Sequence, residues 1–271
     1  MSRAEIRKEN GCYLYEQEIN GLSVHARYSA AAVETLFLPL LREWTERQRR
    51  LGKRLVVFLA APPAAGKSTL VGFLQALSEQ APGVEPLTAI GMDGFHLPQE
   101  YLLTHTVRVG EKEVPMVSIK GAPMTFDLPG LRRRIQRLKE EDVCPWLLYN
   151  RVLHNPEEGK ILVSRSIALL EGNYLLLEQA GWCDLRRYCD VSLRILADSG
   201  SVRERLVQRK MHSGLSRREA EQFVDGSDLP NVALCAAMQR ADVTLRLTDD
   251  GDYVRAEEPQ EALPEKTRYQ F

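Results

Sequence analysis

The sequence predicts an α/β fold, a five-stranded parallel sheet with helices on both faces, and three observations support this prediction. Short apolar runs recur along the chain at residues 55–60, 87–91, 167–170, 191–196 and 243–247. Segments with apolar residues at helical spacing separate these runs, and such alternation builds parallel sheets. The run at 55–60 is apolar at every position, as expected for a central strand that is covered on both faces.

A small N-terminal hairpin and a helix are predicted before the first run. Residues 13–28 form two extended stretches around Asn20 and Gly21, a pair that tolerates the positive φ of a tight turn. Residues 30–48 carry apolar side chains close to helical spacing and lead into a basic run that ends before Gly52. We interpret this basic run as a solvated helix end.

Composition and charge limit the classes of function. The chain has 271 residues, 44% of them hydrophobic and 27% charged, which suits one main globular domain. Lys and Arg number 36 against 37 Asp and Glu, and the formal net charge of −1 gives no field that attracts nucleic acid or an acidic membrane. The five cysteines form no CxxC pair, and no run approaches the roughly 18 apolar residues that span a bilayer. We therefore expect a cytoplasmic protein without a nucleic-acid or membrane partner, and we leave a homodimer open.

A phosphate-binding turn, the Walker A sequence of P-loop NTPases, follows the run at 55–60. Its small residues let successive backbone N–H groups converge on phosphates, and the helix behind them adds partial positive charge. Lys67 is expected to reach the β and γ phosphates of ATP, and the Ser68 hydroxyl is expected to hold Mg²⁺. The predicted nucleotide-binding residues are Pro63, Ala64, Ala65, Gly66, Lys67, Ser68 and Thr69. Ala61 stands where glycine is usual, and because its methyl group requires a negative φ we expect the start of the turn to differ slightly.

Two acidic residues follow predicted strands. Asp93 comes after the run at 87–91, and Glu171 comes directly after the run at 167–170. The carboxyl ends of parallel strands are where ligands of open α/β sheets bind. There, Asp93 can orient and deprotonate an attacking hydroxyl, while Glu171 can act on Mg²⁺ directly or through water. The sequence therefore predicts Mg²⁺- and ATP-dependent phosphoryl transfer to a hydroxyl group.

Together these motifs resemble the pantothenate kinase, uridine kinase and phosphoribulokinase group of P-loop kinases. In that group an aspartate after the second strand meets the acceptor hydroxyl, and a hydrophobic-Glu-Gly strand end serves the metal. More narrowly, the chain is similar to the fructose-kinase-like bacterial branch, from about residue 13 to 247, in the segments 92–97, 120–127, 149–156, 171–176 and 228–231. The resemblance implies a nucleoside-kinase-like fold and an ATP-dependent kinase of a small metabolite, with a fructose-like sugar as the favoured acceptor.

The resemblance also implies an acceptor pocket. Its residues would be Lys120, Tyr149, Arg151 and His154. His96 either contacts the substrate or is packed beside its apolar neighbours. Asn150 stands where the branch often has aspartate, so an amide would replace a carboxylate contact. For Asp127 and Asp228 the sequence allows either helix capping or a role in the site.

A helical segment at 201–212 resembles the lid of such kinases. Guanidinium groups that fold over the γ-phosphate would stabilise the charge of the transition state. Arg205 and Arg209 lie four residues apart and share a helix face, whereas Arg203 points elsewhere. We select Arg209 first and Arg205 second as catalytic residues.

The chain divides into three predicted parts. Residues 1–50 pack on the core as hairpin and helix, and residues 249–271, rich in Glu and Pro, are expected to be a loosely ordered tail. The kinase domain spans residues 51–248 and includes a substrate-pocket insertion at about 98–127 and the lid at about 199–215. Within the insertion, residues 107–119 are expected to form an extended, hairpin-like stretch, and a helix is predicted after the insertion at residues 128–141.

The sequence leaves three alternative functions open. A nucleoside or pantothenate kinase would share the whole phosphate machinery, and only the acceptor pocket would differ. A nucleotide-binding regulatory ATPase is an alternative of another class, although the chain lacks the Asn-Lys-x-Asp guanine reader and a plain switch has no use for Asp93. A binding module without catalysis is the third, with Ala61 and Asn150 as its only indications.

Overall fold

A six-stranded, mostly parallel sheet forms the centre of the computed structural model, which describes residues 4–19, 22–150 and 153–257. In spatial order its strands are β13 (Tyr253–Ala256), β12 (Val243–Leu247), β11 (Val191–Leu196), β4 (Leu55–Ala60), β10 (Ile167–Gly172) and β5 (Leu87–Gly91). Strands β12, β11, β4, β10 and β5 run parallel, and β13 pairs antiparallel with β12. The predicted fold class is confirmed, and β10 extends two residues past its apolar run to include Glu171 and Gly172.

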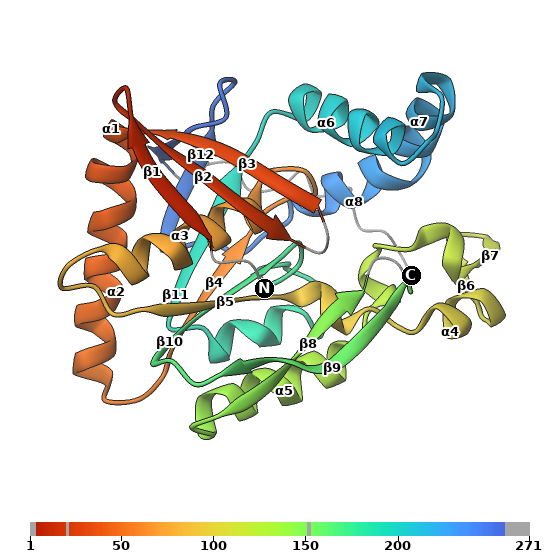
Figure 1. Cartoon of the computed structure of the whole chain (residues 1–271). Coiled ribbons are helices and arrows are strands. Elements are labelled where there is room, and N and C mark those ends of the chain that lie inside the picture. Colours follow the sequence, from red (N-terminus) through yellow and green to blue (C-terminus); the bar gives the residue numbers. More distant parts are fainter. Residues whose placement is uncertain (1–3, 20–21, 151–152, 258–271) are drawn as a thin grey trace.

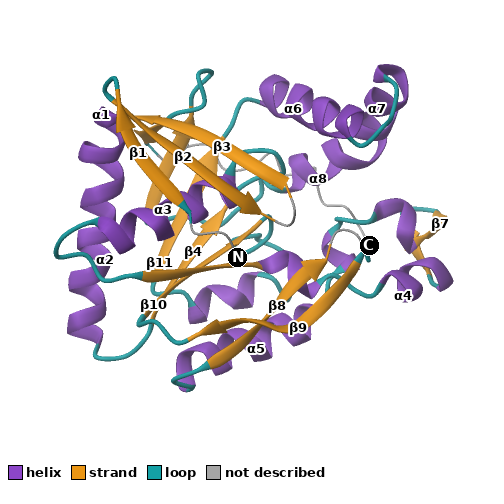
Figure 2. Cartoon of the chain, in the orientation of Figure 1, coloured by secondary structure: helices purple, strands orange, loops and turns teal. Residues whose placement is uncertain are grey.

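Strand β4 shows how the sheet separates two hydrophobic cores. All six of its residues are buried. Leu55, Val57 and Leu59 face one core, while the alternate residues face the other, as the period of two in a strand requires. Figure 2 shows helices on both sides of the sheet, with α2 and α3 on one and α5 on the other.

The helices are mostly where the sequence predicts them. Their bounds, with short helical turns labelled η, are α1 (Ala30–Ala32), η1 (Val33–Phe37), α2 (Leu38–Leu51), α3 (Lys67–Gln80), η2 (Met92–Phe95), α4 (Gln99–Thr104), η3 (Met116–Ile119), η4 (Pro123–Thr125), α5 (Leu128–Glu140), η5 (Cys183–Tyr188), α6 (Ser199–His212), α7 (Arg217–Phe223), η6 (Val224–Asp228) and α8 (Leu229–Leu234). The predicted N-terminal helix runs through a π-helical turn, η1, and ends where Gly52 adopts a left-handed φ of 65°. Across the described residues, no helix combines the length and the apolar character that a membrane crossing requires.

The N-terminal hairpin has a third strand. An antiparallel sheet contains β1 (Glu5–Glu9), β2 (Cys12–Ile19) and β3 (Leu22–Ser29) in that order. Strand β1 is short and largely exposed, so it lacks the apolar alternation that reveals a strand. Asn10 and Gly11 both have positive φ and form its turn, whereas the predicted turn at Asn20 and Gly21 lies outside the described residues.

The expectation of a loosely ordered segment from residue 249 is wrong for β13. Tyr253 pairs with Leu247, and the Thr248 N–H donates to the Asp252 carbonyl at 3.0 Å across the connecting turn. Gly251 provides the positive φ, 86°, that this turn needs. Only four residues long and carrying a charged residue, β13 gives no sequence signal of its own, and its order comes from pairing with β12.

Two antiparallel hairpins lie outside the central sheet. The extended stretch predicted near residues 107–119 is the hairpin of β6 (Thr106–Val109) and β7 (Lys112–Pro115). A second hairpin, β8 (Cys144–Asn150) with β9 (Asn155–Val163), was not predicted. Pro145, Pro156 and Gly159 interrupt its extended pattern, because these residues weaken strand signals. Figure 1 shows α6 and α7 at the same end of the molecule as α4, β6 and β7, away from α2.

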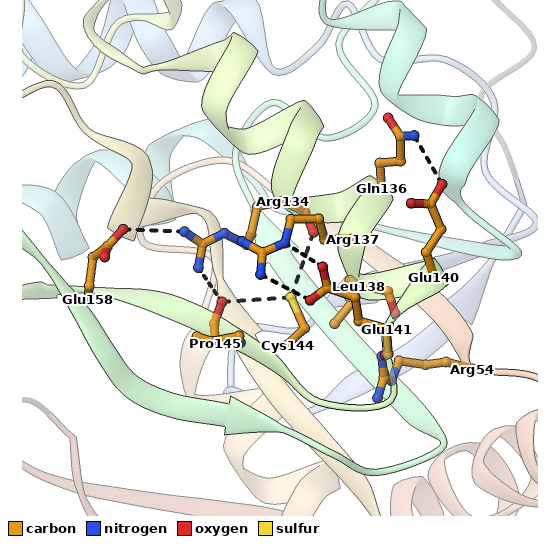
Figure 3. Close-up of polar contacts among 10 residues, drawn as sticks. All are labelled: Arg54, Arg134, Gln136, Arg137, Leu138, Glu140, Glu141, Cys144, Pro145 and Glu158. Carbon is orange, nitrogen blue, oxygen red and sulfur yellow. Dashed lines mark hydrogen bonds and ion pairs between the residues drawn. The ribbon is translucent and has the colours of Figure 1, made fainter.

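A buried arginine fixes the base of the second hairpin. The Arg54 guanidinium donates to the carbonyls of Leu138 and Glu141 at 2.5 Å each, at the C-terminal end of α5. It also donates to the carbonyls of Val163 at 3.2 Å and Arg165 at 2.9 Å, just before β10. Figure 3 shows Arg54 beside these carbonyl groups of α5. One side chain thus joins α5 to the end of β9 and orients the wall of the site described next.

Candidate active site

The phosphate-binding loop joins β4 to α3, and its backbone is bent at two positions. Gly66 has φ 78° immediately before Lys67, the first residue of α3. Ala64 has φ 60°, one of three described non-glycine residues with positive φ. Its methyl group packs against the small hydrophobic core beneath α6, which offsets part of the strain of a left-handed alanine. Ala61 is buried without a positive φ, so the departure in backbone geometry falls on Ala64 rather than at the start of the turn.

Ser68 and Glu171 meet beside this loop. The Ser68 hydroxyl donates to Glu171 Oε1 at 2.7 Å, and Glu171 is only 7% exposed. The contact follows from strand order, because Glu171 lies one residue before the end of β10 and is the register partner of Leu59 in β4. A hydroxyl and a carboxylate are hard oxygen donors of the kind that Mg²⁺ prefers. The residues present therefore fit the predicted metal site.

Asp93 lies at the same edge of the sheet. It belongs to η2, directly after β5, and β5 pairs with β10. A Cβ placed on Gly91 would lie 3.5 Å from Glu171 Oε1 and 4.0 Å from the Asp93 backbone nitrogen. The predicted acid and the predicted metal ligand thus come together next to the phosphate loop.

The β8–β9 hairpin covers the turn that carries Asp93. The Trp146 indole N–H donates to the Gly91 carbonyl at 2.8 Å. Gly94 lies so close to Leu147 that any Cβ would collide with the Leu147 carbonyl. Sequence reasoning missed this wall, and the Trp146 side chain is the feature that positions it.

Three residues predicted to line the acceptor pocket gather on one wall. The His96 ring stacks on Phe126 at 4.0 Å between centroids and lies 5.1 Å from the Tyr149 ring. The Lys120 ammonium lies 5.3 Å over the Tyr149 ring and donates to Gln99 Oε1 at 2.5 Å. Burial lowers the pKa of Lys120. Gln99 was not predicted, and its contact shows that α4 belongs to this wall.

The other predicted pocket residues lie elsewhere or outside the described chain. Arg151 is among the residues that the structure does not describe. His154 is exposed on the β8–β9 turn with φ 53°, and within the described residues it has no hydrogen bond, ion pair or ring contact with that wall. Asn150 holds the same turn, since its Nδ2 donates to Glu157 Oε1 at 3.0 Å and its Oδ1 accepts from the Leu153 N–H at 2.9 Å.

The two aspartates left open by the sequence differ in role. Asp127 caps α5, because its Oδ1 accepts from the Gly130 N–H at 2.9 Å. Asp228 makes no side-chain cap to α8, and its Oδ2 is buried with no hydrogen bond to the described residues. The Lys210 ammonium lies 3.9 Å from that oxygen. Burial raises the pKa of Asp228, although Lys210 and Arg209 act in the opposite direction.

Tyr174 shows that Asp228 and Asp93 lie near each other. Its hydroxyl donates to the Gly121 carbonyl at 2.7 Å. Burial is the main cause that raises the pKa of Tyr174, and the charges of both Asp93 and Asp228 contribute. Both carboxylates therefore lie within electrostatic range of one buried tyrosine, whose hydroxyl is held at the Gly121 loop.

The predicted lid is helix α6, and its basic residues face different neighbours. Arg203 forms a bidentate pair with Asp225 at 2.7 and 2.8 Å, so it points elsewhere as expected. The positive charge of Arg205 acts to lower the pKa of Tyr253. The Tyr253 hydroxyl donates to the Ala65 carbonyl in the phosphate loop at 3.0 Å. The positive charge of Arg209 instead acts to lower the pKa values of Lys210 and Asp228. Tyr253 is a second residue that sequence reasoning missed.

Comparison with known proteins decides the family. YggC, an uncharacterized protein of Escherichia coli strain K12, is 37% identical over 240 residues, 88% of this chain and 97% of YggC. The crystal structure of a "putative fructose transport system kinase" from Silicibacter sp. TM1040 matches with a TM-score of 0.67 and 34% identity, over 76% of this chain and 97% of that one. This chain belongs to the P-loop kinases of the pantothenate kinase, uridine kinase and phosphoribulokinase group.

More distant relatives agree with this assignment. The pantothenate kinase of Actinobacillus succinogenes is 26% identical over 230 residues, 76% of this kinase and 69% of that enzyme. No protein family model matches the chain. The family resemblance inferred from the motifs is confirmed, and with it the kinase and ATP-binding character of the protein.

Proposed function

We propose that this kinase uses ATP and Mg²⁺ to phosphorylate a hydroxyl group of a small metabolite, most specifically a fructose-like sugar. One observation carries the proposal: the Ser68–Glu171 pair beside the phosphate loop adjoins the strand end that holds Asp93. A metal and phosphate site next to a half-buried carboxylate is what transfer to a hydroxyl requires. The name of the Silicibacter protein supports a sugar as the acceptor.

Each residue then has a distinct role. Asp93 orients the acceptor hydroxyl and takes its proton, and Lys67 binds the β and γ phosphates. Ser68 and Glu171 would hold Mg²⁺, which would supply positive charge to the phosphates. Arg205 and Arg209, which share one face of α6, cover the γ-phosphate when the lid closes.

The environment of Asp228 favours an acceptor with more than one hydroxyl group. A buried carboxylate oxygen without a hydrogen bond costs free energy, and a ligand hydroxyl that donates to it removes this cost. The charges of Asp93 and Asp228 both reach Tyr174, and we infer that one polyhydroxylated molecule can contact both carboxylates. Asp93 would engage the reacting hydroxyl and Asp228 a second one.

Acceptor-dependent release of ADP tests the proposal. The purified protein, with ATP and Mg²⁺, is offered fructose and other sugars, pantothenate, uridine and no acceptor. We expect a sugar to raise ADP release by about tenfold or more, and Asp93→Asn to abolish that stimulation. Stimulation by pantothenate or by uridine would instead support a pantothenate kinase or a nucleoside kinase. ADP release that no acceptor changes would support a regulatory ATPase.

A further inference from the structure

The C-terminal strand of the sheet touches the phosphate loop through one side chain. Tyr253, in β13, is 3% exposed, and its hydroxyl donates to the Ala65 carbonyl at 3.0 Å. Gly66 lies against the same hydroxyl, since a Cβ on Gly66 would be 2.6 Å from that oxygen. Only glycine fits here, both because of this contact and because φ is 78°.

The hydrogen bond fixes the orientation of one peptide group. The Ala65 carbonyl and the Gly66 N–H belong to the same planar trans peptide, so they point in opposite directions. When the carbonyl is held toward Tyr253, the Gly66 N–H points away from the tyrosine hydroxyl and is free to join the loop N–H groups that would converge on phosphates. A rotated peptide would turn a carbonyl oxygen toward the phosphates and repel them.

Tyr253 is itself held firmly. Its ring lies 6.1 Å from the rings of both Tyr28 and Phe37, in the core between the N-terminal sheet and α1–α2. The adjacent Asp252 accepts a hydrogen bond from the Ser29 N–H at 3.1 Å. The pairing of β13 with β12 completes the support. The hydroxyl is therefore presented from a rigid layer and not from a mobile tail.

We propose that Tyr253 is a positioning residue of the nucleotide site: its hydroxyl holds the Ala65–Gly66 peptide in the orientation that binds nucleotide phosphates. This inference rests on the proposed function, because it assumes that the loop binds a nucleotide. It assigns to the C-terminal strand a part in binding that the loop sequence alone does not show. The role acts on the phosphate side only and leaves the acceptor wall unchanged.

Tyr253→Phe removes the hydroxyl and keeps the ring. We expect Mg²⁺·ADP and a non-hydrolysable ATP analogue to bind about five- to tenfold more weakly by isothermal titration, the effect of one lost hydrogen bond. The KM for ATP should rise by a similar factor, while the KM for the acceptor stays within about twofold. The matched control is Tyr28→Phe, a buried tyrosine of the same cluster with no described hydrogen bond to the loop.

The outcomes separate the inference from the function on which it rests. Unchanged nucleotide affinity in Tyr253→Phe would overturn the inference and leave the kinase proposal standing. Equal weakening in Tyr28→Phe would overturn it as well, since the effect would then come from packing of the cluster. A wild-type protein that binds no nucleotide would refute both. Thermal unfolding of the two variants verifies that both are folded in the assays.

Discussion

The phosphate side and the acceptor side of this kinase are built in different ways. The phosphate loop follows a strand whose six residues are all buried, and it is backed by the aromatic core that includes Tyr253. The acceptor wall combines the β8–β9 hairpin, α4 and the loops after η2 and η3, where Lys120, Tyr149 and His96 make polar and ring contacts. Phosphate binding needs fixed backbone groups, whereas acceptor recognition depends on side chains that hairpins can vary. Substitutions on the two sides should therefore have separable effects.

The largest expected effect concerns the stability of the acceptor wall. Arg54→Met leaves several buried carbonyl groups of α5 and β9 without their donor, so the free energy of unfolding should fall by about 3 kcal/mol. Denaturant unfolding measures this change. Arg50→Met, at an exposed arginine of α2, should change stability by less than about 0.5 kcal/mol. Equal stability of the two variants would show that the guanidinium does not hold the wall.

The next effect separates catalysis from nucleotide binding. Asp93→Asn should lower kcat by about 100-fold or more, because the amide cannot take the proton of the acceptor hydroxyl. The affinity for Mg²⁺·ATP, measured by titration, should stay the same. Glu100→Gln, an exposed residue of the same side, is the control. An unchanged kcat in Asp93→Asn would remove this residue from the mechanism.

The fold and the candidate site also show which features the sequence predicts and which it does not. The five parallel strands are short, largely apolar runs, and β4 and β10 are buried along their whole length, so local pattern suffices to find them. Strand order then brings Glu171 to Ser68. Strands β1, β8, β9 and β13 are short, charged or interrupted by proline, and tertiary contacts such as Trp146 to Gly91 hold them in place. Tyr253 and Gln99 escaped prediction for the same reason, because their roles depend on partners distant in sequence.

A smaller effect is expected at Asp228, where substitution should weaken acceptor binding and raise the stability of the fold. Asp228→Asn should raise the KM for a polyhydroxylated acceptor about tenfold and leave the KM for ATP unchanged. Burial raises the pKa of this carboxyl in the folded protein, so its ionised form destabilises the fold at neutral pH. The Asn variant should therefore be more stable than wild type above the folded-state pKa, and this advantage should vanish as pH falls below the unfolded-state pKa.

Thermal unfolding at several pH values and acceptor kinetics together check this prediction. Asp225→Asn is the control, since Asp225 is exposed on the same helical turn and pairs with Arg203. An Asp228→Asn variant with an unchanged acceptor KM would show that this carboxylate does not contact the acceptor. A stability difference independent of pH would show that its ionisation is not the cause.

The smallest effect lies in the phosphate loop itself. Ala64→Gly relieves a left-handed alanine but loses packing beneath α6 and adds freedom to the unfolded chain, so stability should change by less than about 1 kcal/mol. Ala61→Gly has no such strain to relieve and should lose about 1 kcal/mol. Calorimetry of both variants measures the difference. A larger loss in Ala64→Gly would mean that the contact with α6 outweighs the strain.

The distance in sequence between Tyr253 and its partner has a consequence for biosynthesis. The hydrogen bond joins residues 188 positions apart. At a translation rate of about 5–20 residues per second, the loop leaves the ribosome about 10–40 s before the tyrosine that secures it. A nascent chain would therefore bind nucleotide with full affinity only after β13 has left the ribosome and paired with β12.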